Sequence, residues 1–304
     1  MAFNSSFMLR KVVVGGLLSA VCGLQILTAC GVDVKKNLGK IQRVEIISII
    51  ADHPEAKPGD TVTLQATAVD PETWGQGNDQ MVYYWVGFYP DAVTSLNLNI
   101  DLNTLNLSTL IGLLAQCTKN QVCQIGGEKS WTVRLPDRTI PEGKAVSYSV
   151  FLLAADSAVT LATALKAQDV TGKYDLAAKS VKVSEKTEAN HNPIIQTITA
   201  PPAIQDASLV KFQVGPGEKV ILTATAIDPD EGDTLSYRWW ILKGRLEDDN
   251  LDRVQWTTPE DPGLYPVYLV VRDEVGEKPK EEPRGGQTII ELQFEVLRAM
   301  PGLP

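Results

Sequence analysis

Four carboxylates lie close together in one short stretch of the sequence, TATAIDPDEGDTLSYRWW, from Thr223 to Trp240. They follow a run of alternating apolar residues and are Asp228, Asp230, Glu231 and Asp233. Carboxylate oxygens at this density suit Ca²⁺, which takes six to eight oxygen ligands in flexible geometry. Two hypotheses follow. Our main one is a solvated turn without any cofactor, and the alternative is a calcium site formed by Asp228, Asp230, Asp233 and Asp273.

The same pattern occurs earlier in the chain, as QATAVDPETWGQGNDQMVYYW from Gln65 to Trp85. Three blocks recur in the same order: PGDTVTLQATAVDP with PGEKVILTATAIDP, MVYYW with LSYRW, and VSYSVFLLAAD with GLYPVYLVVRD. Blocks that repeat in one order indicate an internal duplication. Each block alternates apolar and polar residues, which is the period of a half-buried β-strand.

These elements predict an all-β protein of two tandem immunoglobulin-like (Ig-like) sandwiches. Short strands between Pro, Gly and Asp turns, with Trp85 and Trp239 in the third strand of each copy, are typical of that fold. Tyr265 stands in a D-x-G-x-Y stretch that predicts a tyrosine corner, whereas Tyr148 lacks the matching aspartate. Neither copy has cysteines to bridge its sheets, so we expect apolar packing around the two tryptophans to hold each core.

The second copy resembles a known repeat. Its AxDPDxGDxLSYxW stretch, followed by W-x-x-P and PGxY, is similar to the polycystic-kidney-disease (PKD) type of Ig-like repeat found in bacterial surface proteins. The resemblance is good over residues 190–298, and the first copy is a divergent, enlarged version. It implies a rigid extracytoplasmic spacer or binding module without catalytic activity. It also implies calcium at the acidic turn in some members.

The N-terminus has the pattern of an export signal. Arg10 and Lys11 precede an apolar run that ends in Leu27-Thr28-Ala29-Cys30-Gly31. The last residues resemble a bacterial lipobox, which implies cleavage before Cys30, acylation of its sulfur and, from Gly31, sorting toward the outer membrane. Two or three acyl chains anchor a protein stably, because each buried CH₂ contributes about 0.8 kcal/mol. The alternative is an ordinary signal peptide with a chance cysteine.

The domain boundaries follow from these features. We predict a signal peptide over residues 1–29, a lipid-anchored tether over 30–41 and an enlarged first domain over 42–186. We predict a linker over residues 187–192 and a second domain over residues 193–298. Cys117 and Cys123 are an even pair in an oxidising compartment, and we predict a disulfide between them.

Three insertions enlarge the first copy, and loops are where binding residues concentrate. The first adds Trp74, which is either an anchor for a binding partner or a ring that folds back on its own sandwich. The second, residues 91–130, is either an extra strand with a helix or an apolar protrusion for a protein partner. The third follows Asp156 and predicts a short amphipathic helix.

The net charge of −9 argues against nucleic acid and anionic lipid as partners. The sequence lacks G-x-S-x-G, H-E-x-x-H and G-x-x-x-x-G-K motifs, and we interpret His53 and His191 as equivalents inherited with the repeat, so we predict no enzyme. Our leading hypothesis is a membrane-anchored envelope lipoprotein that binds a protein or polysaccharide in adhesion or envelope assembly. The alternatives are a carbohydrate-binding surface module that uses Trp74, and an accessory lipoprotein of a secretion or motility complex.

Overall fold

The computed structural model describes residues 39–75, 81–94, 112, 122–157, 173–186, 189–201, 203–206, 211–274 and 285–298. Almost all regular structure within these ranges is β-strand, and the single named helix is five residues long, so the all-β prediction is confirmed. The described residues belong to one compact unit. The predicted signal peptide, Cys30 and the tether up to residue 38 lie outside them. No helix in the described ranges is long and apolar enough to cross a membrane.

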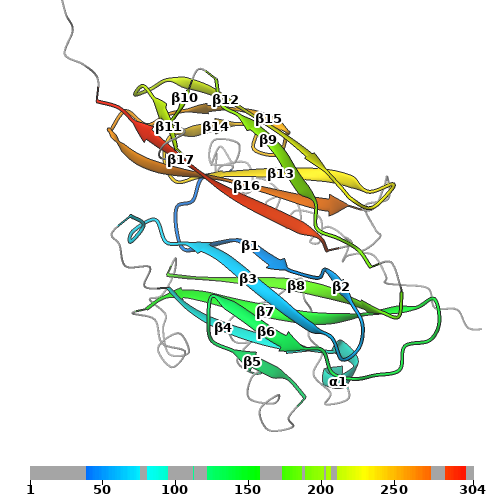
Figure 1. Cartoon of the computed structure of the whole chain (residues 1–304). Helices are drawn as coiled ribbons and strands as arrows, with labels where there is room; N and C mark the ends of the chain where they lie inside the picture. The colour runs from blue at the N-terminus through cyan, green and yellow to red at the C-terminus, as the bar shows by residue number, and fades with distance from the viewer. Residues whose placement is uncertain are drawn as a thin grey trace, which may run out of the picture. The chain divides into compact units, whose positions relative to one another are not determined.

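The first sandwich consists of two stacked sheets with the strand orders β1-β3-β6 and β2-β8-β7-β4-β5 (Figure 1). Its elements are β1 (Glu45–Ala51), β2 (Glu55–Ala56), β3 (Thr61–Val69), β4 (Met81–Phe88), α1 (Pro90–Thr94), β5 (Gln124–Gly126), β6 (Ser130–Arg134), β7 (Ala145–Asp156) and β8 (Tyr174–Ser184). All strand pairs are antiparallel except β2 with β8, which are parallel.

The second sandwich has the orders β14-β15-β12-β9 and β10-β11-β17-β16-β13 (Figure 1). Its elements are β9 (Ile194–Thr199), β10 (Ile204–Asp206), β11 (Lys211–Val214), β12 (Lys219–Ile227), β13 (Thr234–Ile241), β14 (Arg245–Glu247), β15 (Arg253–Thr257), β16 (Gly263–Glu274) and β17 (Gln287–Val296). Within this sandwich β11 and β17 pair in parallel, and the other described strand pairs are antiparallel.

The three repeated sequence blocks occupy equivalent strands. The first block forms the central strands β3 and β12, the second forms β4 and β13, and the third forms β7 and β16. The strand that follows the second block differs between the copies. In the first sandwich this strand, β5, pairs with β4, whereas in the second sandwich it is β14 and pairs with β15. Residues 124–134, which form β5 and β6, therefore belong to the first sandwich itself. The insertion predicted over residues 91–130 is correspondingly shorter.

Each sandwich has its own apolar core. The inward residues of β3 and β12 alternate with outward ones as period 2 requires, and Trp85 and Trp239 are both completely buried. Both indole N–H groups are satisfied, because Trp85 donates to the Glu128 carbonyl at 2.6 Å and Trp239 donates to the Leu251 carbonyl at 2.9 Å. The tryptophan-centred cores are confirmed in both copies.

The tyrosine corner is present in the second copy only. The Tyr265 hydroxyl donates to the carbonyl of Asp261 at 3.0 Å, as the D-x-G-x-Y spacing predicts. The equivalent Tyr148 is fully buried, and its hydroxyl has no partner among the described residues. Its ring packs edge-on against Tyr89 at 5.2 Å, and burial raises the pKa of Tyr148.

A third apolar cluster joins the two sandwiches. This junction cluster consists of Ile41, Ile47, Val69, Leu242, Tyr268 and Val270, each at most 5% exposed. The end of the predicted tether is part of it, because the Ile41 N–H donates to the Ile241 carbonyl at 2.9 Å and the Ile241 N–H donates to the Gly39 carbonyl at 2.7 Å. Residues 39–41 thus pair with β13 of the second sandwich.

Gly39 is required at this pairing. Its φ is +70°, and a Cβ at this position would lie 2.6 Å from the Trp239 carbonyl oxygen. Any other residue would be strained there and would also displace the neighbouring strand.

Candidate metal centre

The acidic turn of the second sandwich brings three carboxylates together. Asp228, Asp230 and Asp233 lie between β12 and β13, and one oxygen of each lies within 4.8 Å of the others. Glu231 in the same turn is exposed and does not join them. Three of the four residues predicted for a calcium site are therefore close enough to share one cation.

The turn and the linker before β9 hold these carboxylates in place. Oδ1 of Asp228 accepts the N–H of Asp230 at 2.8 Å, while its buried Oδ2 has no hydrogen-bond partner among the described residues. Both oxygens of Asp230 face His191, with the backbone N–H at 2.7 Å and the ring Nδ1 at 3.0 Å. One oxygen of Asp228 is thus left for another ligand.

Asp273, the fourth predicted residue, is the penultimate residue of β16 and is 1% exposed. Its Oδ2 accepts the Asn190 side-chain amide at 2.6 Å, and its Oδ1 is buried without a partner among the described residues. Burial raises the pKa of Asp273 to about 6, and the negative charges of Asp228 and Asp233 add to this. A buried carboxylate oxygen without a hydrogen-bond partner costs free energy, which a cation at this place would offset.

The residues present fit calcium. Asp228, Asp230 and Asp233 form the close group, and Asp273 does not belong to it. The charges of Asp228, Asp233 and Lys179 nevertheless act on the Asp273 carboxyl, and the Lys179 ammonium also donates to the Gly285 carbonyl. Burial lowers the pKa of Lys179 to about 8. The side-chain oxygen of Asn190 adds a further buried acceptor without a partner. Oxygen ligands with excess negative charge are what Ca²⁺ binds.

Sequence reasoning missed Asn190, His191 and Lys179. Their positions relative to the acidic turn depend on how the linker and β8 pack against it, and no local pattern marks that packing. The predicted equivalence of His53 and His191 is wrong. His53 follows β1 and lies beside Asp52 at 3.2 Å, whereas His191 precedes β9 and contacts Asp230.

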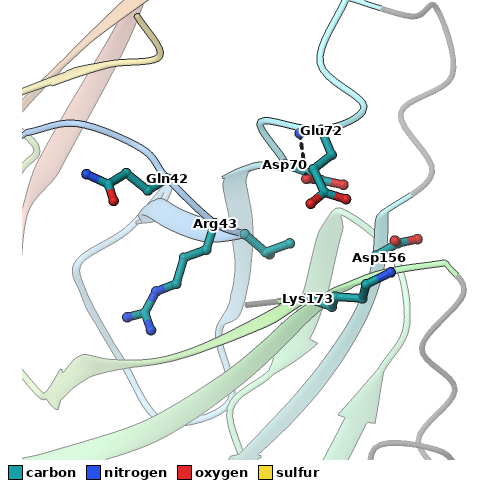
Figure 2. A pocket seen from close by; sticks show the side chains of 7 residues that line it. Gln42, Arg43, Asp70, Glu72, Asp156 and Lys173 are labelled. Carbon is teal, nitrogen blue, oxygen red and sulfur yellow. Dashed lines mark hydrogen bonds between the residues drawn. The ribbon is translucent and has the colours of Figure 1, made fainter. Parts of the chain in front are cut away.

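The first sandwich has a pocket at the place equivalent to this cluster. Asp70, Glu72 and Asp156 correspond in the aligned blocks to Asp228, Asp230 and Asp273. They line a pocket of about 180 Å³ together with Gln42, Arg43, Val44 and Lys173. Figure 2 shows the Lys173 side chain beside Asp156, while Asp70 and Glu72 lie on the facing loop. A lysine side chain therefore shares this site with the carboxylates.

Trp74, the predicted binding anchor, is half-buried and packs against the junction cluster. It also lines a cleft of about 450 Å³, together with Thr67, Ala68, Val69, Asp70, Thr73, Gly75, Lys129, Leu264, Tyr268, Glu291 and Gln293. The ring thus folds back on the molecule and reaches both sandwiches, while its role in partner binding stays a prediction.

Other predicted features lie largely outside the described residues. Cys123 is half-buried, but Cys117 is outside the described ranges, so the disulfide stays a prediction. The strand and helix predicted within residues 95–121 lie outside the described residues except for residue 112, which is helical, and the helix predicted after residue 156 lies outside them from residue 158 onward, so both stay predictions.

No protein-family model and no curated protein matches the chain. Among solved structures, fibronectin(III)-like modules of Clostridium thermocellum CbhA are 13% identical over 84% of this chain and 95% of theirs, with a TM-score of 0.27. Three N-terminal domains of the bacteriophage RB49 outer capsid protein Hoc are 17% identical over 83% and 59%, with a TM-score of 0.25. The adhesin InvE of Yersinia pseudotuberculosis is 11% identical over 83% and 60%, with a TM-score of 0.21. Likenesses this distant carry no argument about function.

Proposed function

We propose that the protein is a non-catalytic binding or scaffold module of the bacterial cell envelope, attached to the membrane through a lipid on Cys30. The lipobox-like sequence supports the anchor. The junction cluster is the observation that carries the scaffold role, because it buries apolar residues of both sandwiches together. Two sandwiches that share a buried interface present their outer loops at a set spacing, which suits a spacer or docking platform.

The anchor is tested by labelling cells with a fatty acid and partitioning the protein between detergent and aqueous phases. We expect the wild-type chain to carry label and enter the detergent phase. The Cys30→Ser variant should carry no label and stay in the aqueous phase. Equal labelling of both chains would contradict a lipid on Cys30.

The scaffold role is tested by crosslinking the protein in its own envelope and identifying its neighbours. Val69→Asp places a charge in the junction cluster, and Thr225→Asp, an exposed position on β12, is the matched control. We expect a defined set of neighbours that is lost in Val69→Asp and retained in Thr225→Asp. The same neighbours with and without an intact junction would contradict a role for the paired sandwiches.

We further propose that the second sandwich binds one calcium ion through Asp228, Asp230, Asp233 and Asp273. The observation that favours it is the unpartnered, buried Oδ1 of Asp273 next to the acidic turn. The bound ion would supply positive charge among these carboxylates and thereby stabilise the turn.

Equilibrium dialysis of the full-length protein against calcium tests this second proposal. We expect one calcium per chain in the wild type and none in Asp273→Asn. Extracellular calcium modules bind as weakly as about 1 mM. Absence of bound calcium in the wild type at several times that concentration would end the proposal.

A further inference from the structure

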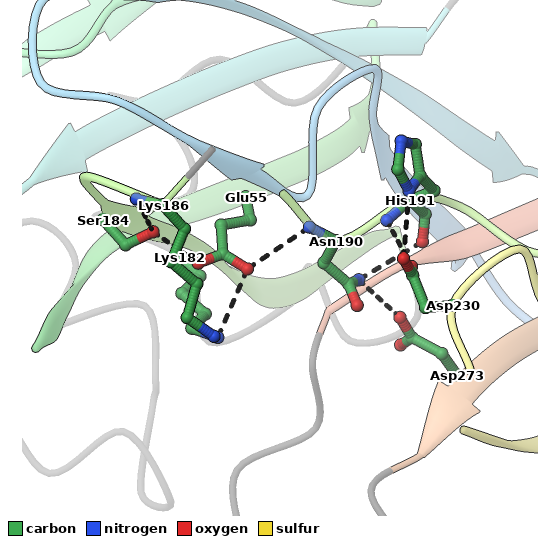
Figure 3. A network of polar contacts seen from close by, with 8 residues as sticks. All are labelled: Glu55, Lys182, Ser184, Lys186, Asn190, His191, Asp230 and Asp273. Atoms are coloured by element: carbon green, nitrogen blue, oxygen red, sulfur yellow. Dashed lines mark hydrogen bonds and ion pairs between the residues drawn. The ribbon is translucent and has the colours of Figure 1, made fainter. Parts of the chain in front are cut away.

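The linker between the sandwiches connects the candidate calcium site to the first sandwich through buried polar contacts. Figure 3 follows these contacts from Glu55 through Asn190 to Asp273. Glu55 is 3% exposed, Asn190 is 5% exposed and Asp273 is 1% exposed. Hydrogen bonds protected from water in this way are stronger than those at a surface, so the orientation of each group is well defined.

Glu55 is fixed within the first sandwich. It belongs to β2, which pairs in parallel with β8, where Glu55 lies opposite Lys182. Its carboxylate accepts a hydrogen bond from the Ser184 hydroxyl and lies 3.3 Å from the Lys182 ammonium. Burial alone would raise the pKa of Glu55, but Ser184, Lys182 and Asn190 outweigh it, and the net pKa is lowered. Glu55 is therefore a stable negative charge at neutral pH.

Asn190 spans the distance from Glu55 to the metal centre. Its backbone N–H donates to Oε2 of Glu55 at 3.3 Å. Its side-chain amide donates to Oδ2 of Asp273 at 2.6 Å and to the His191 carbonyl at 3.2 Å. The amide thereby occupies one oxygen of Asp273 and leaves Oδ1, the oxygen without a partner, for a cation.

The next linker residues reinforce the connection. His191 holds both oxygens of Asp230. Asn192 donates to the Ala51 carbonyl of the first sandwich at 2.8 Å and accepts the Gln287 N–H of the second at 2.9 Å. Three consecutive linker residues thus contact either a proposed calcium ligand or both sandwiches.

We propose that Glu55 is a positioning residue for the calcium site: it fixes Asn190, Asn190 orients Asp273, and calcium binding and the packing of the two sandwiches are therefore coupled. The inference rests on the calcium site proposed above. Coupling of this kind is reciprocal, so whatever holds the linker in place strengthens calcium binding, and calcium in turn holds the linker.

The first test compares calcium dissociation constants of the full-length protein measured by isothermal titration. Glu55→Gln removes the charge and keeps the shape, and Glu142→Gln, in an exposed turn of the same sandwich, is the matched control. We expect about fivefold or greater weakening in Glu55→Gln with one site still present, and no change in Glu142→Gln. Equal affinities of wild type and Glu55→Gln would overturn the inference while leaving the calcium site in place. Absence of calcium binding in the wild type would overturn both.

The second test separates positioning from a general loss of stability. In a double-mutant cycle, Glu55→Gln should weaken binding in the wild-type background but have little further effect in an Asn190→Ala background. Additive losses would overturn the route through Asn190.

Hydrogen exchange of the peptide that spans residues 185–193 gives an independent measurement. Calcium should slow exchange of the Asn190 amide in the wild type and slow it less in Glu55→Gln. The same calcium-dependent slowing in both chains would contradict the coupling.

Discussion

The acidic turns between β3 and β4 and between β12 and β13 occupy equivalent places in the two sandwiches but differ in how their aspartates are hydrogen-bonded. In the first, both oxygens of Asp70 are satisfied, by the N–H of Glu72 at 2.9 Å and the hydroxyl of Thr73 at 3.0 Å. In the second, the equivalent Asp228 receives only the N–H of Asp230, because Glu231 stands where Thr73 would be and has no donor. The hydroxyl of Thr73 thus satisfies the second oxygen of Asp70, and the second oxygen of Asp228 has no hydrogen-bond partner among the described residues.

The surroundings of the two turns differ in the same direction. Asp273 is buried and faces Asn190, whereas the equivalent Asp156 is half-buried beside Lys173 (Figure 2). β1 and β9 are in equivalent register, since Ile46 pairs with Ala68 and Ile195 pairs with Ala226. Asn190 therefore corresponds to Ile41, which packs in the junction cluster. The two copies thus share the sandwich, but the first pairs its carboxylates with a lysine and its own turn, and the second leaves buried carboxylate oxygens without hydrogen-bond partners among the described residues.

The largest expected effect concerns the buried core tryptophans that both sandwiches share. Trp85→Ala and Trp239→Ala should each lower the free energy of unfolding by about 3–5 kcal/mol, because each removes a fully buried indole from a close-packed core. Denaturant unfolding followed by circular dichroism measures this, with Trp74→Ala, which is half-buried, as a control of smaller loss. A loss below about 1 kcal/mol at either core position would show that the cores are not equivalent.

The next prediction tests the difference between the acidic turns. Calcium at about one hundred times its dissociation constant should stabilise the wild type by about 2.7 kcal/mol. Asp228→Asn should abolish this gain, and Asp70→Asn, at the equivalent position of the first copy, should retain it. Thermal melts with and without calcium measure the three shifts. An equal loss in both variants would remove the distinction between the two ends.

Without calcium, lowering the pH should increase the stability of the fold through protonation of Asp273. The pKa of Asp273 is about 6 in the folded chain and 3.8 as the ordinary value, so the folded state binds the proton more tightly. Ionised Asp273 therefore costs stability above pH 6, and this cost is relieved as the pH falls toward 4. Between pH 7.5 and pH 5 the gain from this group is on the order of 1 kcal/mol.

Unfolding in a chelator at both pH values measures this gain. Because other groups titrate in the same range, the quantity of interest is the wild-type change minus that of Asp273→Asn. A difference of zero or of opposite sign would contradict the raised pKa.

The smallest effect compares the two tyrosines. Tyr265→Phe removes the hydrogen bond to Asp261 and should cost about 0.5–1.5 kcal/mol. Tyr148→Phe removes a buried hydroxyl that has no partner among the described residues, so we expect no loss or a small gain. Denaturant midpoints of the two variants measure this, and an equal loss in both would contradict the absence of a corner in the first copy.

The sequence was sufficient for the repeated strands and their cores, because period 2 and three ordered blocks are local signals. It also placed the acidic turn, whose three aspartates lie within six positions. It did not indicate the contact of Glu55 with Asn190, which are 135 positions apart and meet only when the sandwiches pack. The pairing of residues 39–41 with β13 was missed for the same reason, since nothing in GKI distinguishes a tether from an edge strand.

That pairing has a mechanical consequence. If the chain is held at Cys30, eight residues separate the anchor from Gly39, a reach of about 30 Å when extended. Tension applied to the molecule would then act first on residues 39–41, which are hydrogen-bonded to β13 of the second sandwich. The next element along the chain is β1 of the first sandwich. The load would be divided between both sandwiches at their junction, so neither has to bear the tension alone.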